Sequence, residues 1–316
     1  MRSSVADSNP APSGPMPLGP TSTGPTPQVP LSLAKPAGRR WLRRGLTLAI
    51  ITYTASLIVL YLWMRWYGDR QWLATLFLFG PRWICALPLP VLAVGAAIWH
   101  RKALGLLMVA GLVIVGPIMG FQLNLASSGP GTLRIMTCNV DQYSYRAVEL
   151  EELIEREQPD IVALQEVPGR AEFLWPSGWH VVHRDEYVVA SRYPVHEQEH
   201  VARPTVPGKL AAMRFTVQLP DREVQIFNLH SPTPRPGLEA VLDRRTGLDM
   251  GQVGTLEEVL RIRAEESQLV SDWVASFPGP KIVVGDFNMP IESGIFRDAW
   301  SPLKNAFAME IGRAHV

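Results

Sequence analysis

Three long runs without a charged residue constrain the fold of this chain more than any other feature. They span residues 46–63, 83–99 and 103–121, and a helix of this length crosses a hydrocarbon core of roughly 30 Å. The alternative, buried helices of a soluble core, would require three nearly uncharged helices in succession. We therefore expect residues 39–122 to form a transmembrane region with three spans, and the protein to be embedded in a membrane.

The residues that flank these runs indicate an orientation. Arginines precede the first run at 39–44, and residues 100–102 form a basic loop between the second and third runs. Such loops favour the cytoplasmic side, although the loop at 65–82 is also basic. We expect an integral protein of a bacterial plasma membrane, with everything after Phe121 extracytoplasmic. Aromatic residues typical of a membrane interface lie near the run ends: Trp41, Trp63, Trp66, Tyr67, Trp72, Trp83 and Trp99.

Composition characterises the N-terminal segment and argues against several classes of protein. Residues 1–38 are rich in Pro, Ser, Gly and Thr and bury too little apolar surface to order themselves, so we expect a disordered tail. A signal peptide requires an apolar run directly after its first basic residue, and this segment has none.

The net charge of the whole chain is +1, which provides no general attraction for nucleic acid. Cys85 and Cys138, the only cysteines, indicate neither a disulfide framework nor a zinc site.

Residues 132–309 alternate between strand and helix patterns, which is typical of an α/β or α+β domain. The expected helices cover 147–157 and 255–277, the second beginning at a capping box made by Thr255 and Glu258. The expected strands cover 133–140, 161–167, 187–191, 211–219, 224–230 and 282–284.

Polar residues lie at the ends of four of these strands. In KIVVGDFNMP at 281–290, Gly285 is expected to end a buried strand, after which Asp286 and Asn288 would project the same way. The other three strand ends carry Asn139 with Asp141, Gln165 with Glu166, and Asn228 with His230. Any one of these residues could merely cap a turn, but four such ends could converge on one rim of a sheet.

The ordered series NVD at 139–141, LQEV at 164–167, SRYP at 191–194, NLHSP at 228–232 and GDFN at 285–288 resembles the endonuclease/exonuclease/phosphatase family. That family includes DNase I-like nucleases, apurinic endonucleases, inositol-polyphosphate phosphatases and sphingomyelinases. The resemblance implies that the domain at 132–309 is an α/β (α+β) four-layer sandwich of two mixed β-sheets flanked by helices. The three-helix transmembrane region precedes it and contributes nothing to the resemblance.

The resemblance also implies a metal site. Glu166 would be the principal ligand of a Mg²⁺ or Mn²⁺ ion, with Asn139 and Asp141 beside it, assisting through hydrogen bonds or bound water. Oxygen ligands of this kind suit Mg²⁺, which binds through one or two carboxylates, several waters and the substrate phosphate.

The same resemblance assigns the catalytic residues. His230 would contact the scissile phosphate or act as an acid near the leaving group. Asp286 would orient or deprotonate the attacking water, and Asn288 would hold a phosphate oxygen. Asn139 completes the catalytic set. Arg192, in SRYP, is left out because packing or a salt bridge accounts for an arginine there.

One required family element, a Ser-x-Asp-His segment near the C-terminus, has no counterpart here. Only His315 follows Asn288 among the histidines, and it lies in Arg-Ala-His-Val. The final EIGRAHV resembles a translated sequencing adapter, so we expect residues 310–316 to be a non-native tail on an incomplete domain, and the fragment to be impaired. The alternative is a genuine short variant. An open reading frame that continues into Ser-x-Asp-His without the adapter would confirm the truncation.

These expectations favour a membrane-anchored, metal-dependent phosphoesterase that cleaves a phosphodiester or phosphomonoester by in-line attack of water. The alternative is a catalytically degenerate membrane protein that binds phosphate-containing ligands. The substrate could be nucleic acid or a phospholipid head group, and no obligate protein partner is inferred. Arginines that could contact either substrate are Arg235, Arg244, Arg245, Arg261 and Arg263.

Overall fold

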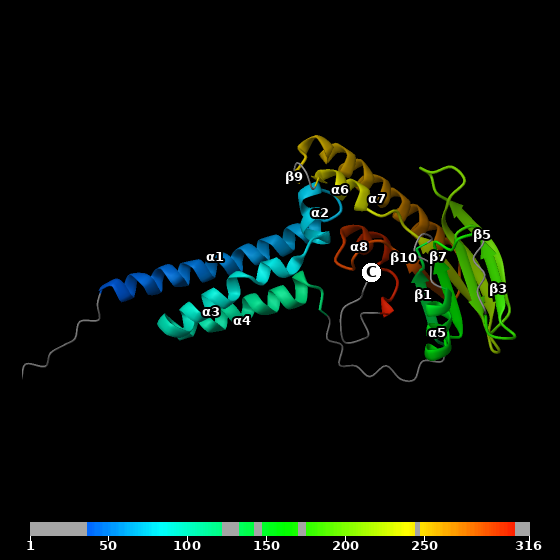
Figure 1. Cartoon of the computed structure of the whole chain (residues 1–316), viewed down its shortest axis with the longest axis horizontal. Helices are drawn as coiled ribbons and strands as arrows, with labels where there is room; N and C mark the ends of the chain where they lie inside the picture. Colours follow the sequence, from blue (N-terminus) through cyan, green and yellow to red (C-terminus); the bar gives the residue numbers. More distant parts are fainter. Residues whose placement is uncertain (1–36, 122–132, 142–146, 170–174, 244–246, 307–316) are drawn as a thin grey trace, which may run out of the picture.

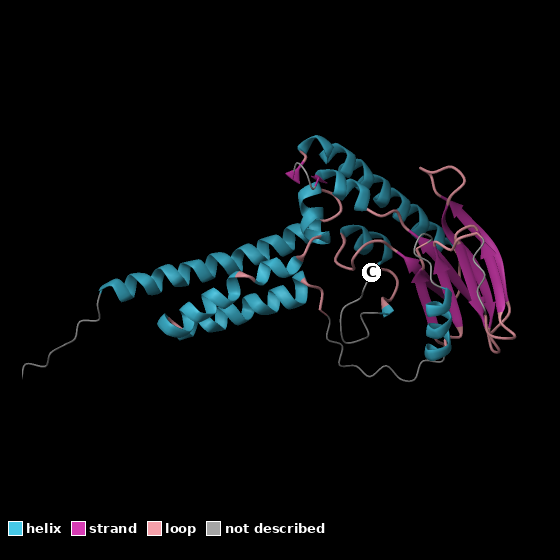
Figure 2. Ribbon diagram, viewed as in Figure 1, coloured by secondary structure: helices cyan, strands magenta, loops and turns pink. Residues whose placement is uncertain are grey.

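The computed structural model describes residues 37–121, 133–141, 147–169, 175–243 and 247–306. Residues 1–36 of the expected disordered tail, the expected non-native tail at 310–316 and Arg244 and Arg245 lie outside the described residues. A helical region extends to one side of a domain that contains all of the long strands (Figures 1 and 2).

The three apolar runs are helical, as predicted. Three helical segments are long and apolar enough to cross a membrane by length and composition: Arg40–Tyr67, Arg82–Trp99 and Arg101–Ile118. The helices in this region are α1 (Ala37–Tyr67), α2 (Trp72–Phe79), the 3-10 turn η1 (Arg82–Ala86), α3 (Pro88–Trp99), the 3-10 turn η2 (Arg101–Ala103), α4 (Leu104–Val113) and the π-turn η3 (Ile114–Ile118).

Prolines divide the helices of this region. Pro88 occupies the first turn of α3, where its missing N–H costs nothing, and separates α3 from η1. Gly80 and Pro81 end α2, which is therefore a separate short helix rather than an extension of the second span. Among the described residues, apolar side chains such as Val91, which is 74% exposed, face outward, and this is the arrangement expected of helices that face lipid.

Two mixed four-stranded sheets form the second region. The parallel pairs are β1 with β2 and β10 with β7, and every other neighbouring pair in these two sheets is antiparallel. The first sheet has the order β1 (Ile135–Asn139), β2 (Ile161–Gln165), β4 (Tyr187–Ser191), β3 (His180–Arg184), and the second the order β10 (Lys281–Asp286), β7 (Glu223–His230), β6 (Leu210–Gln218), β5 (Val195–Ala202).

The two sheets pack face to face, and helices cover their outer faces. Ile161 and Val189 of the first sheet join Phe215 and Ile226 of the second in one fully buried core. Helix α5 (Ala147–Glu157) covers the first sheet through Leu150 and Ile154, while α7 (Val253–Ser276) and α8 (Gly294–Trp300) cover the second. The predicted four-layer sandwich is therefore confirmed. The remaining elements are α6 (Arg235–Val241), β8 (Leu242–Asp243), β9 (Gly247–Leu248) and η4 (Met250–Gln252).

Two local predictions were wrong. Helix α7 begins at Val253, because the preceding turn η4 leads directly into it, so Thr255 lies inside the helix and cannot form the capping box. Gly285 does not end its strand, since β10 continues to Asp286. Gly285 has a φ of +132°, and a Cβ atom there would lie 1.9 Å from the Leu229 carbonyl oxygen of β7, so a side chain at this position would clash.

The loop between β10 and α8 packs on the turn that joins α1 to α2 and on the first residue of η1. The buried Asp69 carboxylate accepts a hydrogen bond from the Ser293 hydroxyl. Arg82 Nη1 lies 3.2 Å from Glu292 Oε2 and also donates to the Ile118 carbonyl at 2.9 Å. Burial raises the pKa of Asp69, and the nearby charge of Arg263 offsets part of that rise. These contacts fix the domain that contains the two sheets against the helical region.

Candidate active site

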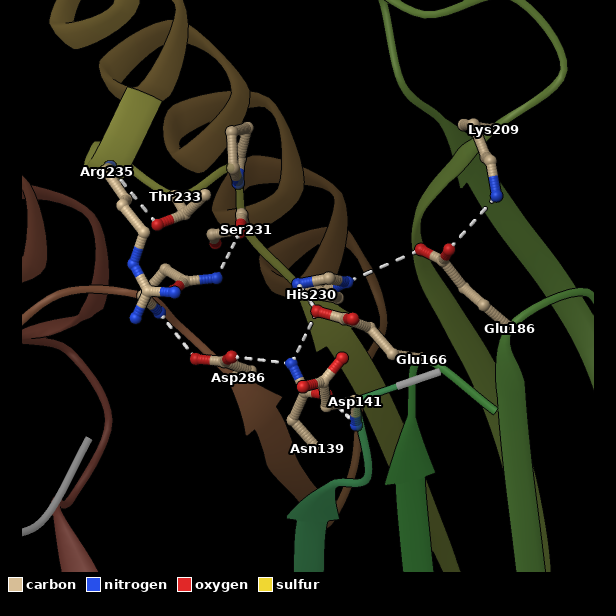
Figure 3. A network of polar contacts seen from close by, with 12 residues as sticks. Asn139, Asp141, Glu166, Glu186, Lys209, His230, Ser231, Thr233, Arg235 and Asp286 are labelled. Carbon is tan, nitrogen blue, oxygen red and sulfur yellow. Dashed lines mark hydrogen bonds and ion pairs between the residues drawn. The ribbon is translucent and has the colours of Figure 1, made fainter. Parts of the chain in front are cut away.

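The carboxyl ends of β1, β2, β7 and β10 meet at one rim of the sandwich. Parallel pairing brings Asn139 of β1 level with Gln165 of β2, and Asp286 of β10 level with His230 of β7. The residues predicted at the four strand ends therefore do converge (Figure 3). They come from both sheets, so the rim spans the top of the sandwich.

A single amide links the two sheets at this rim. Asn139 Nδ2 donates to Glu166 Oε1 at 2.7 Å and to Asp286 Oδ2 at 2.9 Å. The backbone N–H of Asp141 donates to Asn139 Oδ1 at 3.0 Å, which fixes the orientation of the amide. Asn139 therefore holds two carboxylates close together and uses both of its N–H groups to do so.

Three of the predicted site residues have left-handed backbone conformations. The φ angles are +48° at Asp141, +55° at Glu166 and +49° at Asn288. Asparagine and aspartate tolerate this conformation, but glutamate does so less readily. A strained residue at a strand end costs on the order of 1–3 kcal/mol, and such residues are concentrated at functional sites. The strain at Glu166 turns the chain just past β2, where its carboxylate meets Asn139.

His230 lies between two carboxylates. Its Nε2 atom is 3.3 Å from Glu166 Oε1, and its Nδ1 atom is 3.4 Å from Glu186 Oε1. Lys209 Nζ lies 3.2 Å from the other oxygen of Glu186. Burial alone would raise the pKa of Glu186, but hydrogen bonds from His230 and Lys209 lower it below its usual value. The imidazole is thus held at both nitrogen atoms.

Glu186 was not predicted from the sequence, although a signal for it existed. It precedes β4, whereas the residues predicted from the motifs follow strands. Because β4 runs antiparallel to β2, the residue before β4 lies beside the residue after β2. The backbone confirms this neighbourhood, since the Val167 N–H donates to the Glu186 carbonyl at 3.0 Å.

Asn288 departs from the predicted geometry. Its left-handed backbone breaks the strand direction, so its side chain does not project alongside that of Asp286 as strand neighbours two apart would. Instead its N–H donates to Asp286 Oδ1 at 2.8 Å, and its Nδ2 atom donates to the Ser231 carbonyl at 2.8 Å. Asn288 therefore braces Asp286 and retains one N–H of its amide for a ligand.

Two arginines brace the loops from beneath. Arg263 of α7, whose side chain is fully buried, donates to the Asn288 carbonyl at 2.9 Å and to the Pro232 carbonyl. Arg203 donates to the His230 carbonyl and pairs with the buried Glu266. Arg263 is therefore not available to a substrate as the sequence suggested, and it instead joins the loops that follow β7 and β10.

Gln165 and Asn228, which also end strands in the motifs, have a structural role. Both are fully buried, and Gln165 Nε2 donates to Asn228 Oδ1 at 2.6 Å, while Asn228 Nδ2 donates to the Leu164 carbonyl at 3.0 Å. These bonds join the two sheets directly below the rim.

The donor atoms at the rim suit a magnesium ion. Within the described ranges, no group of three or more His, Cys, Asp and Glu residues is arranged to hold a metal. Mg²⁺ does not need such a group, because it binds through one or two carboxylates and completes its shell with water and phosphate. Glu166 and Asp286 both reach the same Asn139 nitrogen atom, and Asp141 lies exposed beside them. The oxygen set therefore fits Mg²⁺ or Mn²⁺.

Several solved structures resemble the chain. Truncated TDP2 from Caenorhabditis elegans is 16% identical with a TM-score of 0.35, and the match covers 51% of this chain and 64% of that protein. An endonuclease/exonuclease/phosphatase from Beutenbergia cavernae is 20% identical with a TM-score of 0.32, covering 50% and 48%. The 3′ phosphatase NExo from Neisseria is 22% identical with a TM-score of 0.31, covering 50% and 58%. The chain thus spans less than two thirds of each of these proteins.

Sequence comparison gives the family. No curated protein matches the chain. The model of the endonuclease/exonuclease/phosphatase family matches residues 124–313, which is more than half of the chain and includes every strand of both sheets. With its two mixed sheets and its rim of converging motifs, this chain belongs to the endonuclease/exonuclease/phosphatase family.

Proposed function

We propose that this chain is a membrane-anchored phosphoesterase that hydrolyses a phosphodiester or phosphomonoester with the help of Mg²⁺ or Mn²⁺. The observation that carries the proposal is that Asn139 holds Glu166 and Asp286 together at one rim, with His230 3.3 Å from Glu166. Membership of the family is consistent with it, because endonucleases, exonucleases and phosphatases all cleave phosphoesters.

Glu166 is the principal metal ligand in this proposal, with Asn139 and Asp141 beside it. When bound, the ion neutralises charge on the phosphoryl oxygens. Asn139 keeps the Glu166 and Asp286 carboxylates close together before any ligand arrives. That arrangement needs little reorganisation when the substrate binds, which is the condition for effective electrostatic stabilisation.

The remaining residues act on the water and the leaving group. Asp286, fixed by Asn139 and by the backbone N–H of Asn288, orients the attacking water. His230 contacts the phosphate and supplies a proton to the leaving oxygen. Glu186 accepts from the second ring nitrogen and so fixes the orientation of the imidazole. The free amide N–H of Asn288 holds a phosphoryl oxygen.

Hydrolysis of bis(p-nitrophenyl) phosphate tests this proposal. The assay uses the product of the complete open reading frame that contains residues 1–316, with Mg²⁺ or with EDTA. Glu166→Gln should lower the rate by at least about a hundredfold, because it removes a charge from the site. Glu265→Gln, on the exposed face of α7, is the matched control and should keep the rate. Equal rates for the wild type and Glu166→Gln would refute the metal role, and phosphate binding without turnover would favour a degenerate binding protein.

We further propose that the catalytic domain is extracytoplasmic. The proposal rests on the basic residues at 39–44 and 100–102 and on three candidate spans. Alkaline phosphatase joined after Phe121 tests it, because that reporter is active only outside the cytoplasm. An inactive reporter, together with a fluorescent GFP fusion at the same place, would show that the domain is cytoplasmic and refute the proposed orientation.

A further inference from the structure

A cavity of about 520 Å³ lies between the membrane-proximal helices and the catalytic domain. Leu78 and Phe79 of α2 line one side, while Leu238 of α6 and Ile291 of the β10–α8 loop line the other. Asn288, which braces Asp286, is also part of its wall. The cavity therefore reaches from the catalytic rim to the membrane-proximal region.

Arg235 supplies a cation to this cavity. Its side chain is exposed, and no ion-pair partner for it occurs among the residues that the structure describes. Figure 3 shows the side chain extending from the start of α6 toward the rim where Asp286 lies. A guanidinium group beside an amide N–H suits a phosphate oxygen. Arg82, by contrast, is already engaged by the Leu78 and Ile118 carbonyls and by Glu292.

A second cavity of about 250 Å³ adjoins the first. It lies among α1, α2 and η1, and Leu60, Leu76 and Ile118 are among its apolar lining residues. Both cavities have Gly80 and Arg82 in their walls. The space lined by Arg235 and Asn288 thus lies next to an apolar space in the helical region.

The surroundings of these cavities favour a lipid ligand. Trp83 and Ile84 of η1 are 56% and 49% exposed, on the turn whose Arg82 lines both cavities. An exposed tryptophan beside apolar residues is typical of a membrane interface. A nucleic acid would need a basic groove and aromatic stacking surfaces, whereas apolar side chains such as Leu78, Leu238 and Ile291 line much of the larger cavity.

On this basis, and provided that the proposed phosphoesterase function holds, we propose that the substrate is a membrane phospholipid. Its phosphate lies beside Asn288 and Arg235 in the larger cavity, and an acyl chain occupies the apolar cavity among α1, α2 and η1. Water adds to phosphorus, the P–O bond to the leaving alcohol breaks, and a proton is transferred to the leaving oxygen. The phosphodiester gives an alcohol and a phosphomonoester.

Activity on four probes tests the proposal, using the complete reading frame product in detergent micelles with Mg²⁺. The probes are dioleoyl phosphatidylglycerol, its dibutyryl analogue, bis(p-nitrophenyl) phosphate and a single-stranded oligonucleotide. We expect kcat/KM for the dioleoyl lipid to exceed that for the dibutyryl lipid by at least about tenfold, because many buried methylene groups are lost with the shorter chains. Equal values for the two lipids, or a higher value for the oligonucleotide, would overturn the proposal.

Filling the apolar cavity should affect only the long-chain lipid. Leu76→Trp should lower kcat/KM for the dioleoyl lipid by about tenfold and leave bis(p-nitrophenyl) phosphate hydrolysis unchanged, which also shows that the variant is folded. Val94→Trp, on the outward face of α3, is the matched control and should change neither rate. If Leu76→Trp leaves dioleoyl hydrolysis unchanged, the acyl chain does not occupy this cavity.

A binding measurement separates this inference from the function on which it rests. Phosphatidylglycerol with a diazirine in its acyl chain is photolysed with the Glu166→Gln variant, and labelled peptides are mapped by mass spectrometry. We expect labels at residues that line the apolar cavity, such as Leu60, Met64, Leu73, Leu76, Cys85 and Ile118. Labels confined to outward faces such as Val94 would refute the lipid site. If bis(p-nitrophenyl) phosphate is not hydrolysed, the phosphoesterase function fails, whatever the labelling shows.

Discussion

Replacing Asn139 with aspartate tests the site without a substrate. The change keeps the oxygen that accepts from the Asp141 N–H but removes both bonds to Glu166 and Asp286 and places a third carboxylate between them. Each hydrogen bond to a charged group contributes about 1.5–3 kcal/mol. Because Asn139 is half-buried, we take the lower value for each bond, which gives a loss of about 3 kcal/mol before charge repulsion is added.

In EDTA, this loss should lower the apparent Tm of the catalytic domain by about 6–12 °C, measured by tryptophan fluorescence. Mg²⁺ should raise Tm more in Asn139→Asp than in the wild type, because the third carboxylate adds a ligand and binding stabilises the folded state. Asn139→Ala is the control, since it also loses the bonds to Glu166 and Asp286, together with the one from the Asp141 N–H, but adds no ligand. Equal Tm values for the wild type and Asn139→Asp in EDTA, or equal shifts with Mg²⁺, would refute this account of the site.

Three further substitutions test other parts of the structure. Gly285→Ala should destabilise the domain by about 3 kcal/mol or more, because it combines an unfavourable φ with a clash at Leu229; Gly279→Ala, which has a positive φ without a clash, should cost less in the same denaturant titration. Glu186→Gln should remove a stabilisation that is complete above the usual glutamate pKa of 4.5 and is lost as the pH falls through the lowered value, so the Tm difference from wild type should shrink in acid. Burial raises the pKa of Asp69, so its contribution is complete below its usual pKa of 3.8 and is lost as the pH rises through the raised value; Asp69→Asn should therefore gain stability relative to wild type as the pH rises, and a constant difference would contradict this.

The sequence predicted elements well where side-chain patterns are strong. Helix α5 and strand β4 have the predicted bounds, because an apolar face repeats clearly in the helix and every residue of β4 is buried. Strands β3 and β5 were missed because most of their side chains are exposed, so apolar alternation is absent. The short helix α8 was missed because its start depends on a cap from Ser293 rather than on its own periodicity.

Site residues that directly follow a strand could be predicted from the sequence. Contacts between residues far apart in the sequence could not. Asn139, Glu166, His230 and Asp286 could be found from motifs, but the two hydrogen bonds by which Asn139 joins Glu166 to Asp286 depend on how the two sheets pack. The contact of Asp69 with Ser293 joins residues 224 positions apart. No local pattern reports such a pair, so the packing of the two-sheet domain on the apolar helices could not be predicted.

That packing has a practical consequence for anyone who wishes to crystallise the catalytic domain alone. A water-soluble fragment beginning at residue 132 would expose Ser293, which is now fully buried, together with Leu256 and Leu260, which pack against Trp72. The same cut would remove the Phe79 ring that lies 5.7 Å from the Arg263 guanidinium. Since Arg263 holds the loops that carry His230 and Asn288, an inert soluble fragment would reflect its missing helices rather than a lack of catalytic chemistry.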